Sequence, residues 1–296
     1  MQVGVYVLDL AEIDDRSQTF LADLIVNLLW KDPRLAFDPH SGPSSRVLPL
    51  AEVWNPGFFM VNQRRVTVSS PRSVRVEADG SVHYRTRALV TLASPLDLRE
   101  FPFDQQTLWI RLVSPHRPEE LAVTVVPELT GRLPNFSVAG WRVELGEPVV
   151  DKLEADGGRR AAARVGFPLL ADRRTGYYIW KILIPMAFIV FMAWSVFWIS
   201  PSQLGPRIGV ATASIFTLIA FQIQISGVLP PISYLTQVDE FVVGSSALIF
   251  LALGETVLTA SLAGQERAEL ALVIDHHSRW IYLLLFAAMG VVTLFI

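Results

Sequence analysis

Polar side chains interrupt a long uncharged segment in the second half of the sequence. Between Ile208 and Leu229 no residue carries a charge, and the segment is long enough to cross about 30 Å of hydrocarbon. Hydroxyl and amide groups recur within it, at Thr212, Ser214, Thr217, Gln222, Gln224 and Ser226. Thr and Ser can bond their own helix backbone in a membrane, and Gln can bond a neighbouring helix. The pattern therefore predicts a membrane helix with protein neighbours. If one face of this helix contacts water, several copies of the chain must surround an axis.

Two ionisable residues lie inside other apolar segments. Lys181 stands about one turn inside the first of these segments, so its amine can reach the headgroups. Glu255 stands about two turns from the end of a later segment, and a carboxylate within a membrane usually faces a partner or water. Two roles for Glu255 stay open, a structural hydrogen bond to a neighbouring helix and the sensing of pH or lipid.

Other kinds of chemistry find little support in the composition. The chain has no cysteine, which excludes disulfides, thiolate metal sites and a cysteine nucleophile. The five histidines are dispersed apart from the adjacent pair His276 and His277, and adjacent residues do not share a helix face, so no metal site is expected. We find no phosphate loop, no G-x-S-x-G elbow and no carboxylate pair on a familiar scaffold. The sequence indicates neither an enzyme nor a cofactor, and the net charge of −3 does not suggest a nucleic-acid partner.

Hydropathy divides the chain into two domains. The residues are 51% hydrophobic with a mean hydropathy of +0.39, more apolar than is usual for a soluble protein of this size. The change falls at "ADRRTGYYIW", which predicts an aqueous domain over 1–174 and a membrane domain over 175–296. The start "MQVGVYVLDL" has no basic region, apolar core or cleavage site, so either a signal peptide has been removed or this domain stays inside the cell.

The first domain is expected to be built from strands. Short segments rich in Val, Leu, Thr and aromatic residues recur at about ten-residue spacing, and turn residues separate them. In "SVRVEADGSVHYRTRALV" two alternating runs are joined by Asp79 and Gly80, a dipeptide that suits a tight hairpin. No stretch shows a sustained helical period. These features predict a β-sandwich.

The second domain is expected to cross the membrane four times. Apolar segments cover about 177–199, 207–229, 238–263 and 279–296, each near the roughly 20 residues of a membrane helix, although the last is short. Aromatic residues at the ends of the first segment suit the membrane interface. They are Tyr177, Tyr178, Trp180 and Trp198. Four helices of one chain packed together leave no water-filled opening. A second helix that contacts water on one face therefore favours a homo-oligomer.

The segment "SPLDLREFPFDQQTL" has the spacing of a known signature loop. It contains an aromatic-Pro-aromatic-Asp core at Pro102, Phe103 and Asp104, with Ser94 and Leu108 at the two positions where relatives have cysteine. On these residues the chain resembles the pentameric ligand-gated ion channels, or Cys-loop receptors, and especially the bacterial members that lack the loop cysteines.

Further segments extend the resemblance over nearly the whole chain. "WKDPRLAF" and "VWNPGFFMVN" are similar to two family segments of the first domain, and Arg173 stands twelve residues before Pro185 as in the family. The resemblance implies an all-β, Ig-like extracellular or periplasmic sandwich followed by an all-α four-helix transmembrane domain. It also implies a homopentamer in the cell membrane that conducts inorganic ions and responds to a small-molecule agonist or to protons.

The resemblance further implies which residues of the second helix face the pore. Carried over position by position, they are Gly209, Ala213, Phe216, Ala220, Ile223 and Gly227, which step at three- and four-residue spacing. Relatives usually have polar residues at the first two positions and Leu at the third. Five Phe216 rings are expected to form a hydrophobic gate that excludes water, unless Phe216 packs between helices instead.

The inner mouth implied by the resemblance consists of Gly205, Pro206 and Arg207. Cation channels among the bacterial relatives carry Glu at this mouth, and this chain has no acid between Trp198 and Thr217. The positive ends of the helix dipoles also point at the mouth. Anion permeation is therefore expected, with a cation-selective channel of the same family as the alternative.

The agonist is less visible in the sequence. Ile25 and Val61 stand where relatives often have aromatic residues, and the expected capping hairpin "VVDKLEADGGRRAAARV" has none, which disfavours a cationic amine. Arg159 and Arg160 are candidate contacts for an anionic ligand, and protons remain a candidate through Asp, Glu and His residues.

The resemblance also implies a set of residues that couple the sandwich to the pore helices. They are Asp32, Pro102, Phe103, Asp104, Arg173, Pro230 and Tyr234. A cluster of carboxylates around an arginine can hold two parts of a protein together and shift between states. Two other functions stay open, a non-conducting membrane receptor or adhesion module and a membrane enzyme.

Overall fold

The computed structural model of the chain divides into two compact units. It describes residues 1–38, 40, 43–68, 72–155, 160–227, 232–265 and 267–295. The sandwich unit comprises Met1–Leu96 and Gln105–Asp172, and the helical unit comprises Asp97–Asp104 and Arg173–Ile296. The short segment Asp97–Asp104 thus belongs with the helices although it lies within the first half of the sequence.

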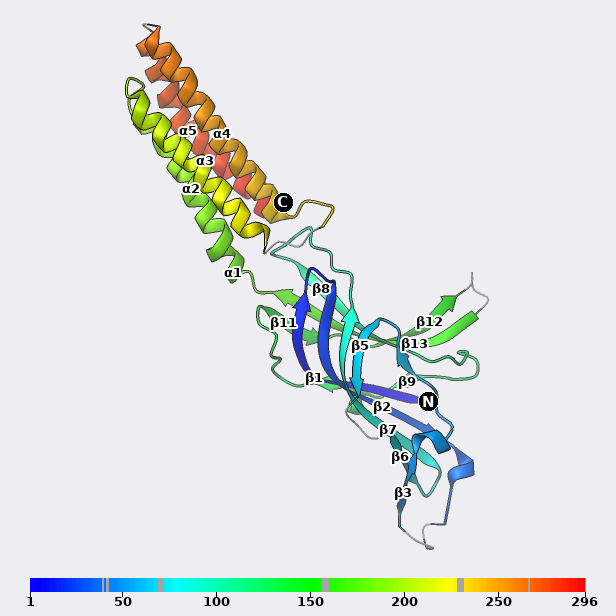
Figure 1. The fold of residues 1–296 in the computed structure, drawn as a ribbon. Helices are drawn as coiled ribbons and strands as arrows, with labels where there is room; N and C mark the ends of the chain where they lie inside the picture. The colour runs from blue at the N-terminus through cyan, green and yellow to red at the C-terminus, as the bar shows by residue number, and fades with distance from the viewer. Residues whose placement is uncertain are drawn as a thin grey trace. The chain divides into compact units, whose positions relative to one another are not determined.

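The sandwich unit consists of two sheets, as the alternating sequence predicts. One sheet has the order β10-β1-β2-β7-β6-β3, with β5 paired to β7 and β9 to β1, and the other has the order β11-β13-β8-β4, with β12 paired to β13 (Figure 1). The strands are β1 Gln2–Asp14, β2 Thr19–Lys31, β3 Ser45–Pro49, β4 Phe59–Met60, β5 Gln63–Val68, β6 Ser73–Glu77, β7 Ser81–Ala93, β8 Gln105–Val113, β9 Thr124–Val125, β10 Gly131–Arg132, β11 Trp141–Leu145, β12 Val149–Ala155 and β13 Arg160–Arg173.

Period-two alternation sets the face that each strand buries. Along β2 every second residue is buried, beginning with Phe20 and ending with Trp30. Because side chains of a strand point alternately to its two faces, a register slip of one residue would expose this whole apolar set. β2 pairs with β7 over its full length, from Thr19 opposite Ala93 to Lys31 opposite Ser81. The buried residues of both sheets form the core of the unit.

The predicted hairpin at Asp79 and Gly80 is confirmed, and it joins β6 to β7. Gly80 has a φ of +83°, in the left-handed region that favours glycine. A Cβ at this position would lie 2.6 Å from the carbonyl oxygen of Asp32, so a side chain has no room there. The amide of Gly80 donates to the carbonyl of Glu77 at 2.9 Å and closes the turn.

The helical unit is a bundle of four long helical segments. A first segment runs from Gly176 to Trp198 and combines α1, a π turn, α2 and a final 3-10 turn (Figure 1). Their bounds are α1 Gly176–Tyr178, the π turn Ile179–Leu183, α2 Ile184–Trp194 and the 3-10 turn Ser195–Trp198, followed by α3 Leu204–Ser226, α4 Gln237–Gly264 and α5 Ala268–Phe295. Pro185 explains the π turn, because proline cannot donate to the carbonyl four residues earlier.

Three helical segments in the described part of the chain are long and apolar enough to cross a membrane. They are Gly176–Trp198, Leu204–Ser226 and Gln237–Gly264. The fourth predicted crossing lies in the second half of α5 and is not among them. The first half of α5 carries charged residues, among them Glu269, Asp275 and Arg279.

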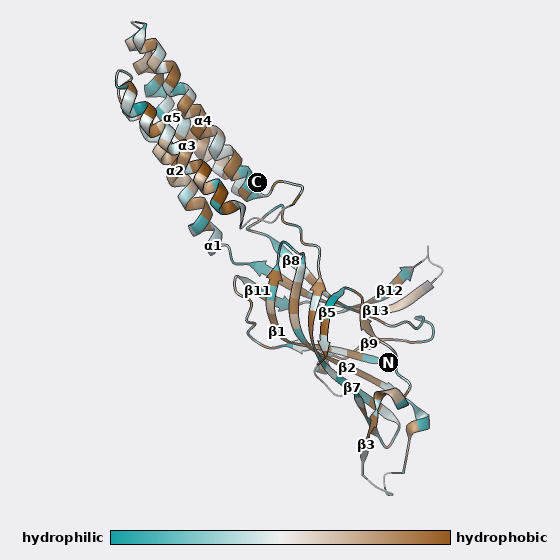
Figure 2. Cartoon of the chain, viewed as in Figure 1, coloured by the Kyte–Doolittle hydropathy of each residue, from teal (hydrophilic) through white to brown (hydrophobic). Residues whose placement is uncertain are grey.

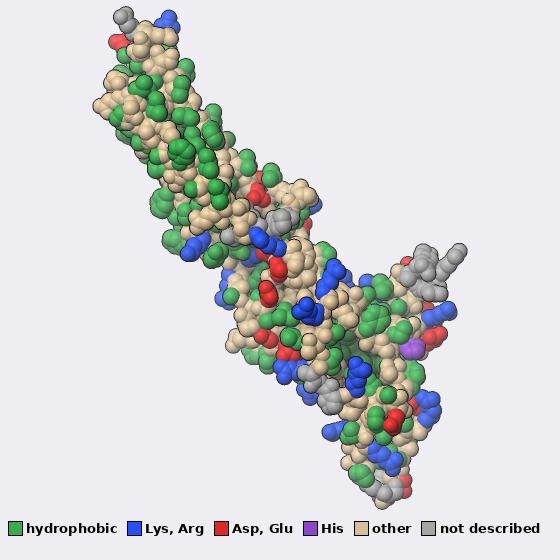
Figure 3. Space-filling model, viewed as in Figure 1, with side chains coloured by type: hydrophobic (Ala, Val, Ile, Leu, Met, Phe, Trp, Pro, Cys, Tyr) green, Lys and Arg blue, Asp and Glu red, His purple; other side chains and the backbone are tan. Residues whose placement is uncertain are grey.

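The outer surface of the bundle is apolar. Figures 2 and 3 show hydrophobic residues along its exposed helix faces. Trp180, Phe188 and Leu284 are each about 70% exposed, at 71%, 68% and 70%. Soluble proteins rarely expose apolar surface of this extent, whereas lipid tails and neighbouring membrane helices cover it. The surface therefore identifies a membrane domain.

Candidate functional site

The helix α3 has two faces of different character. Its buried residues are Arg207, Ala211, Ser214, Leu218, Phe221 and Ile225. The six residues predicted to line a pore are all exposed in the single chain, and they are Gly209, Ala213, Phe216, Ala220, Ile223 and Gly227. The two sets have the same three- and four-residue steps and are offset by two residues, so they lie about 200° apart around the helix. The bundle of one chain thus leaves this stripe uncovered.

The exposed stripe of α3 is apolar and carries two large side chains. Phe216 is 68% exposed and Ile223 is 70% exposed, and the other four members are Gly or Ala. Exposed side chains of this size on a helix of a bundle need lipid, water or another copy beside them. Phe216 does not pack between the helices of its own chain.

The polar residues of α3 mostly bond to helix backbone or to a neighbour. The hydroxyl of Thr217 donates to the carbonyl of Ala213 at 2.8 Å, and that of Ser214 donates to the carbonyl of Val210 at 2.9 Å. Gln222 donates through Nε2 to the hydroxyl of Ser246 on α4 at 3.0 Å. These bonds confirm that hydroxyls bond their own helix and that a glutamine joins two helices.

The inner-mouth prediction needs a correction at Arg207. Gly205 and Pro206 are exposed, but Arg207 is fully buried at 0% exposure. Its guanidinium donates to both carboxylate oxygens of Asp275 on α5 at 2.8 and 3.0 Å, and to Glu255 on α4 at 3.2 Å. Arg207 is two residues before Gly209 and therefore belongs to the buried face. Its charge is held by carboxylates inside the bundle.

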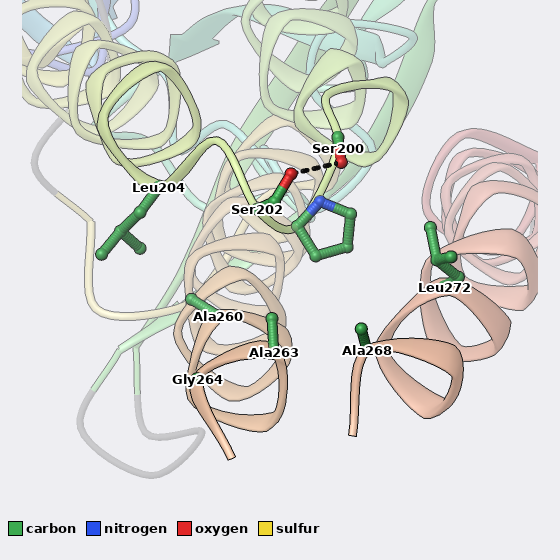
Figure 4. Close-up of a pocket in the computed structure, with 9 residues that line it drawn as sticks. Ser200, Ser202, Leu204, Ala260, Ala263, Gly264, Ala268 and Leu272 are labelled. Atoms are coloured by element: carbon green, nitrogen blue, oxygen red, sulfur yellow. Dashed lines mark hydrogen bonds between the residues drawn. The ribbon is translucent and has the colours of Figure 1, made fainter. Parts of the chain in front are cut away.

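A hollow lies at the end of the bundle where α2 passes into α3. Its volume is about 540 Å³, and Figure 4 shows mostly small side chains around it. The hydroxyls of Ser200 and Ser202 bond each other at 2.9 Å. The nine described lining residues carry no charge, and they are Ser200, Pro201, Ser202, Leu204, Ala260, Ala263, Gly264, Ala268 and Leu272. These lining residues therefore provide no charged side chain that could bind an ion.

An ion pair organises the predicted coupling residues. Arg173 donates to Asp104 through Nε at 2.7 Å and through Nη2 at 3.1 Å, and both side chains are almost fully buried. The guanidinium also donates to the hydroxyl of Tyr178 at 3.3 Å and lies 4.7 Å from the ring centre of Phe101. A bidentate, stacked arginine fixes the orientation of its partners. The segment Asp97–Asp104 is thereby attached to the start of the first membrane helix.

The same segment is attached to the start of α4. The carbonyls of Arg99 and Phe101 accept hydrogen bonds from the amides of Gln237 and Val238, at 3.0 and 3.3 Å. These amides belong to the first turn of α4, where backbone donors have no partner within the helix. Farther back, the amide of Leu98 donates to the hydroxyl of Tyr234 at 2.9 Å. One short segment therefore contacts two membrane helices.

The remaining coupling candidates lie in two different parts of the structure. Pro102 and Phe103 lie in the segment just described, and the bond between Phe101 and Pro102 is cis. Asp32 lies at the end of β2 opposite the β1–β2 turn, caps the 3-10 turn Pro33–Leu35 and pairs with Arg34 at 2.7 and 2.8 Å.

The structure thus gives Asp32 a local role within the sandwich unit, because a short polar side chain before a helical turn accepts from its backbone amides. Pro230 lies outside the described residues.

The candidate ligand contacts lie in the expected hairpin that contains Arg159 and Arg160 and near Ile25 of β2. Arg159 lies outside the described residues, as does the side chain of Arg160. Ile25 lines a hollow of about 260 Å³ in the sandwich unit together with Arg85 and Glu128. This hollow offers charges of both signs to a small polar molecule.

Sequence reasoning missed Asp275 as a partner of Arg207. Asp275 lies 68 residues from Arg207 in the sequence, in a stretch of α5 that carries other polar residues. A charged residue within a membrane segment usually pairs with another group, as Glu255 does here, but which helix supplies the partner depends on packing.

Two family models and one characterised channel are similar to this chain. The model of the neurotransmitter-gated ion-channel ligand-binding domain matches residues 1–128, and the model of the neurotransmitter-gated ion-channel transmembrane region matches residues 182–269. The chain is similar to the proton-gated ion channel of Gloeobacter violaceus, with 28% identity over 298 residues, covering 100% of this chain and 82% of that protein.

Proposed function

The chain belongs to the pentameric ligand-gated ion channel family, and from this premise we propose that five copies enclose a pore lined by α3 and closed at Phe216. It is a membrane protein with an extracellular N-terminal domain, and it is not an enzyme. The pore carries inorganic ions and opens in response to a small-molecule ligand or to protons. We also propose that the second half of α5 completes a fourth crossing of the membrane.

The observation that carries this proposal is the uncovered stripe of α3. All six expected lining residues are exposed in the single chain, while the opposite stripe is packed against the other helices. Copies arranged around an axis would turn this stripe toward a shared opening. Gly and Ala at four of the six positions would leave space, and Phe216 and Ile223 would form the two narrow apolar rings.

The proposed gate at Phe216 works by exclusion of water. An ion crossing a narrow apolar ring must give up its hydration shell without receiving protein oxygens in return. Opening would then require a tilt or rotation of α3 that widens the ring. The contacts of the segment Asp97–Asp104 with Tyr178, Tyr234 and the first turn of α4 offer a route by which the extracellular domain could drive such a movement.

We propose protons as the stimulus, by analogy with the similar proton-gated channel of Gloeobacter violaceus. Hydrogen bonds from arginine or serine partners lower the pKa of several carboxylates in the sandwich unit, so these groups stay ionised when the solution becomes acidic. Asp151, for example, has a pKa below its usual range because Arg164 donates to its oxygens. The proton-binding groups must therefore be found among carboxylates that are not compensated in this way.

For ion selectivity we propose a preference for anions. The described residues of the exposed α3 stripe carry no acid, and the N-termini of five helices would bring about 2.5 positive charges to the inner mouth. Arg207 adds nothing to this field, because Asp275 and Glu255 bind it inside the bundle. Because Arg207 is buried and does not face the inner mouth, the mouth has less positive charge than expected. This observation favours the alternative, a cation-selective channel.

Current recording from the purified chain in planar lipid bilayers tests the proposal. A step to acidic pH should open channels, and under a potassium chloride gradient the current should reverse near the chloride equilibrium potential. Reversal near the potassium potential would replace anion with cation selectivity. An assembled protein that carries no current at any pH or with small carboxylates and amines would support the non-conducting receptor instead.

A further inference from the structure

Three charged groups meet inside the helical unit, away from the proposed gate and the coupling contacts. Arg207 comes from the first turn of α3, Glu255 from α4 and Asp275 from α5. The side chains of Arg207 and Asp275 are 0% and 1% exposed, and that of Glu255 is 13% exposed. This cluster joins the proposed pore helix to the two helices behind it.

The charges of the cluster do not balance when all three groups are ionised. One guanidinium faces two carboxylates, which leaves one negative charge in a region of low dielectric constant. Arg207 binds Asp275 through two hydrogen bonds and Glu255 through one, so Asp275 is the better compensated carboxylate. Within the described residues, Glu255 Oε1 is buried and has no hydrogen-bond partner. An uncompensated buried carboxylate is costly, and a proton removes that cost.

The other polar groups around Glu255 do not supply the missing positive charge. Ser278 and Tyr282 of α5 line the same hollow, and the Tyr282 hydroxyl lies 3.4 Å from the carbonyl of Val190 on α2. Arg279 donates to the carbonyl of Phe197 and stacks on Trp198. His276 and His277, the neighbours of Asp275 in sequence, are exposed.

We propose that Glu255 and Asp275 share one proton beside Arg207, and that this cluster is a proton-binding site that sets the position of α3. The inference rests on the proposed function, since it names a group that would make the channel respond to pH. With the proton bound, Glu255 is neutral and can donate to Asp275, and the cluster has no net charge. When the proton leaves, Glu255 becomes a second full negative charge next to Arg207.

Loss or gain of this proton changes how firmly α3 is held. Arg207 stays charged in both states, so what changes is the direct attraction between opposite charges, which is strong in a region of low dielectric constant and is present only when Glu255 is ionised. Ionised Glu255 therefore binds Arg207 tightly and ties the first turn of α3 to α4, whereas protonated Glu255 weakens that tie. Arg207 lies two residues before Gly209 of the exposed stripe, so a shift of this turn moves the inner end of the proposed pore. Protons should thus favour the open channel.

The proton has a route to the site. Glu255 lines a hollow of about 210 Å³ whose other walls include Leu248, Leu251 and Ile281. A water molecule occupies about 30 Å³ of liquid, so the hollow has room for a few waters near Glu255 and Ser278. The carboxyl can therefore exchange its proton without unpacking of the bundle.

Infrared difference spectroscopy of the reconstituted pentamer tests proton binding without reference to currents. A carboxylic acid C=O band should be lost when the pH is raised in the wild type, and this band should be missing in Glu255→Gln. The band should also be missing in Asp275→Asn, because Glu255 alone with Arg207 would be ionised. Glu269→Gln, an exposed acid on α5, is the matched control and should keep the band. A band that persists in Glu255→Gln and Asp275→Asn overturns the proposed site.

Recording of pH-dependent currents tests the consequence for gating. Glu255→Gln mimics the protonated state, so its midpoint of activation should move by at least about one pH unit toward alkaline pH, a tenfold change in proton concentration. An unchanged midpoint or an acidic shift overturns the link to α3. If neither protein carries current while the infrared band behaves as described, the proton site stands and the proposed channel function fails.

Discussion

Phe216 bears most of the proposed barrier to ions in the resting channel. It is the largest side chain on the exposed stripe of α3, and it is 68% exposed in the single chain. Replacing Phe216 by Ser would introduce a hydroxyl and remove the apolar ring, so water could fill the constriction. Phe216→Ser should therefore raise the conductance at rest by at least about tenfold, which removal of roughly 1.4 kcal/mol from the barrier would produce.

The neighbouring residue gives the control for this prediction. Ile215 lies about 100° farther round the helix and off the exposed stripe. Ile215→Ser should leave the resting current at the level of the parent in the same bilayer recording. Equal resting currents in Phe216→Ser and the parent would place the barrier elsewhere.

Arg173 is expected to be essential for both stability and gating. Removing one partner of a buried ion pair leaves an unpaired charge and costs about 3–5 kcal/mol. In Arg173→Ala, Asp104 would be left buried without its bidentate partner, and the contacts to Tyr178 and Phe101 would be lost. The variant should show a lower thermal midpoint and no stimulus-dependent current.

Arg174→Ala is the matched control, since Arg174 is the next residue and is exposed. It should behave as the parent in thermal denaturation and in current recordings. Normal gating in Arg173→Ala would remove this ion pair from the coupling route.

A substitution at Asp32 is expected to lower the stability of the protein and to leave its gating unchanged. Hydrogen bonds from Arg34 hold the pKa of the Asp32 carboxyl below its usual range. Because the folded pKa lies below the unfolded value of about 3.9, the ionised pair stabilises the fold above that pH, and the contribution is lost as pH falls through the folded pKa. Asp32→Asn should lower the thermal midpoint at neutral pH, and its difference from the parent should shrink below about pH 4. The pH midpoint of the current should not move, and a shift would return Asp32 to the gating set.

At the scale of elements, the segment Asp97–Asp104 is the part whose contacts matter most. It reaches α4 through backbone bonds and reaches Tyr234 through the amide of Leu98. Tyr234→Phe removes the acceptor of that amide and leaves a backbone donor unpaired, at a cost of about 1–3 kcal/mol. The stimulus needed for half-maximal current should rise by about tenfold. Tyr177→Phe, at an exposed tyrosine, should leave it unchanged, and equal midpoints in both variants would contradict the role given to Tyr234.

Much of this arrangement could be predicted from the sequence because local patterns determine it. The alternation of β2, the Asp79–Gly80 hairpin and the two stripes of α3 each follow from the period of a strand, a turn or a helix. A resemblance to a family supplied the identity of the exposed stripe, which periodicity alone leaves open.

Other features depend on contacts between distant residues and could not be predicted in this way. The sequence placed Arg207 at the pore mouth, yet Glu255 and Asp275 draw it into the bundle. Asp32 was assigned to the coupling cluster, but its nearest cation is Arg34, two residues away. In both cases a charged side chain pairs with a partner that packing, and not spacing, brings within reach.

At the scale of the whole molecule, the exposed apolar surface of the helical unit requires partners. Lipid can cover residues such as Phe188 and Leu284, and we propose that other copies surround the stripe with Phe216 and Ile223. The gate, the ion preference and the coupling route all assume this pentameric arrangement around α3. None of these three proposals holds if the stripe faces lipid.

Cysteine accessibility in the open channel measures this arrangement most directly. The chain contains no cysteine, so single cysteines can be introduced without background reaction. Ala213 and Ala211 are matched alanines on the exposed and buried faces of α3. A charged, water-soluble methanethiosulfonate should rapidly and irreversibly change the current through Ala213→Cys channels and leave Ala211→Cys channels unaffected. Reaction at Ala211→Cys alone, or no change of current at Ala213→Cys, would contradict a pore lined by this face of α3.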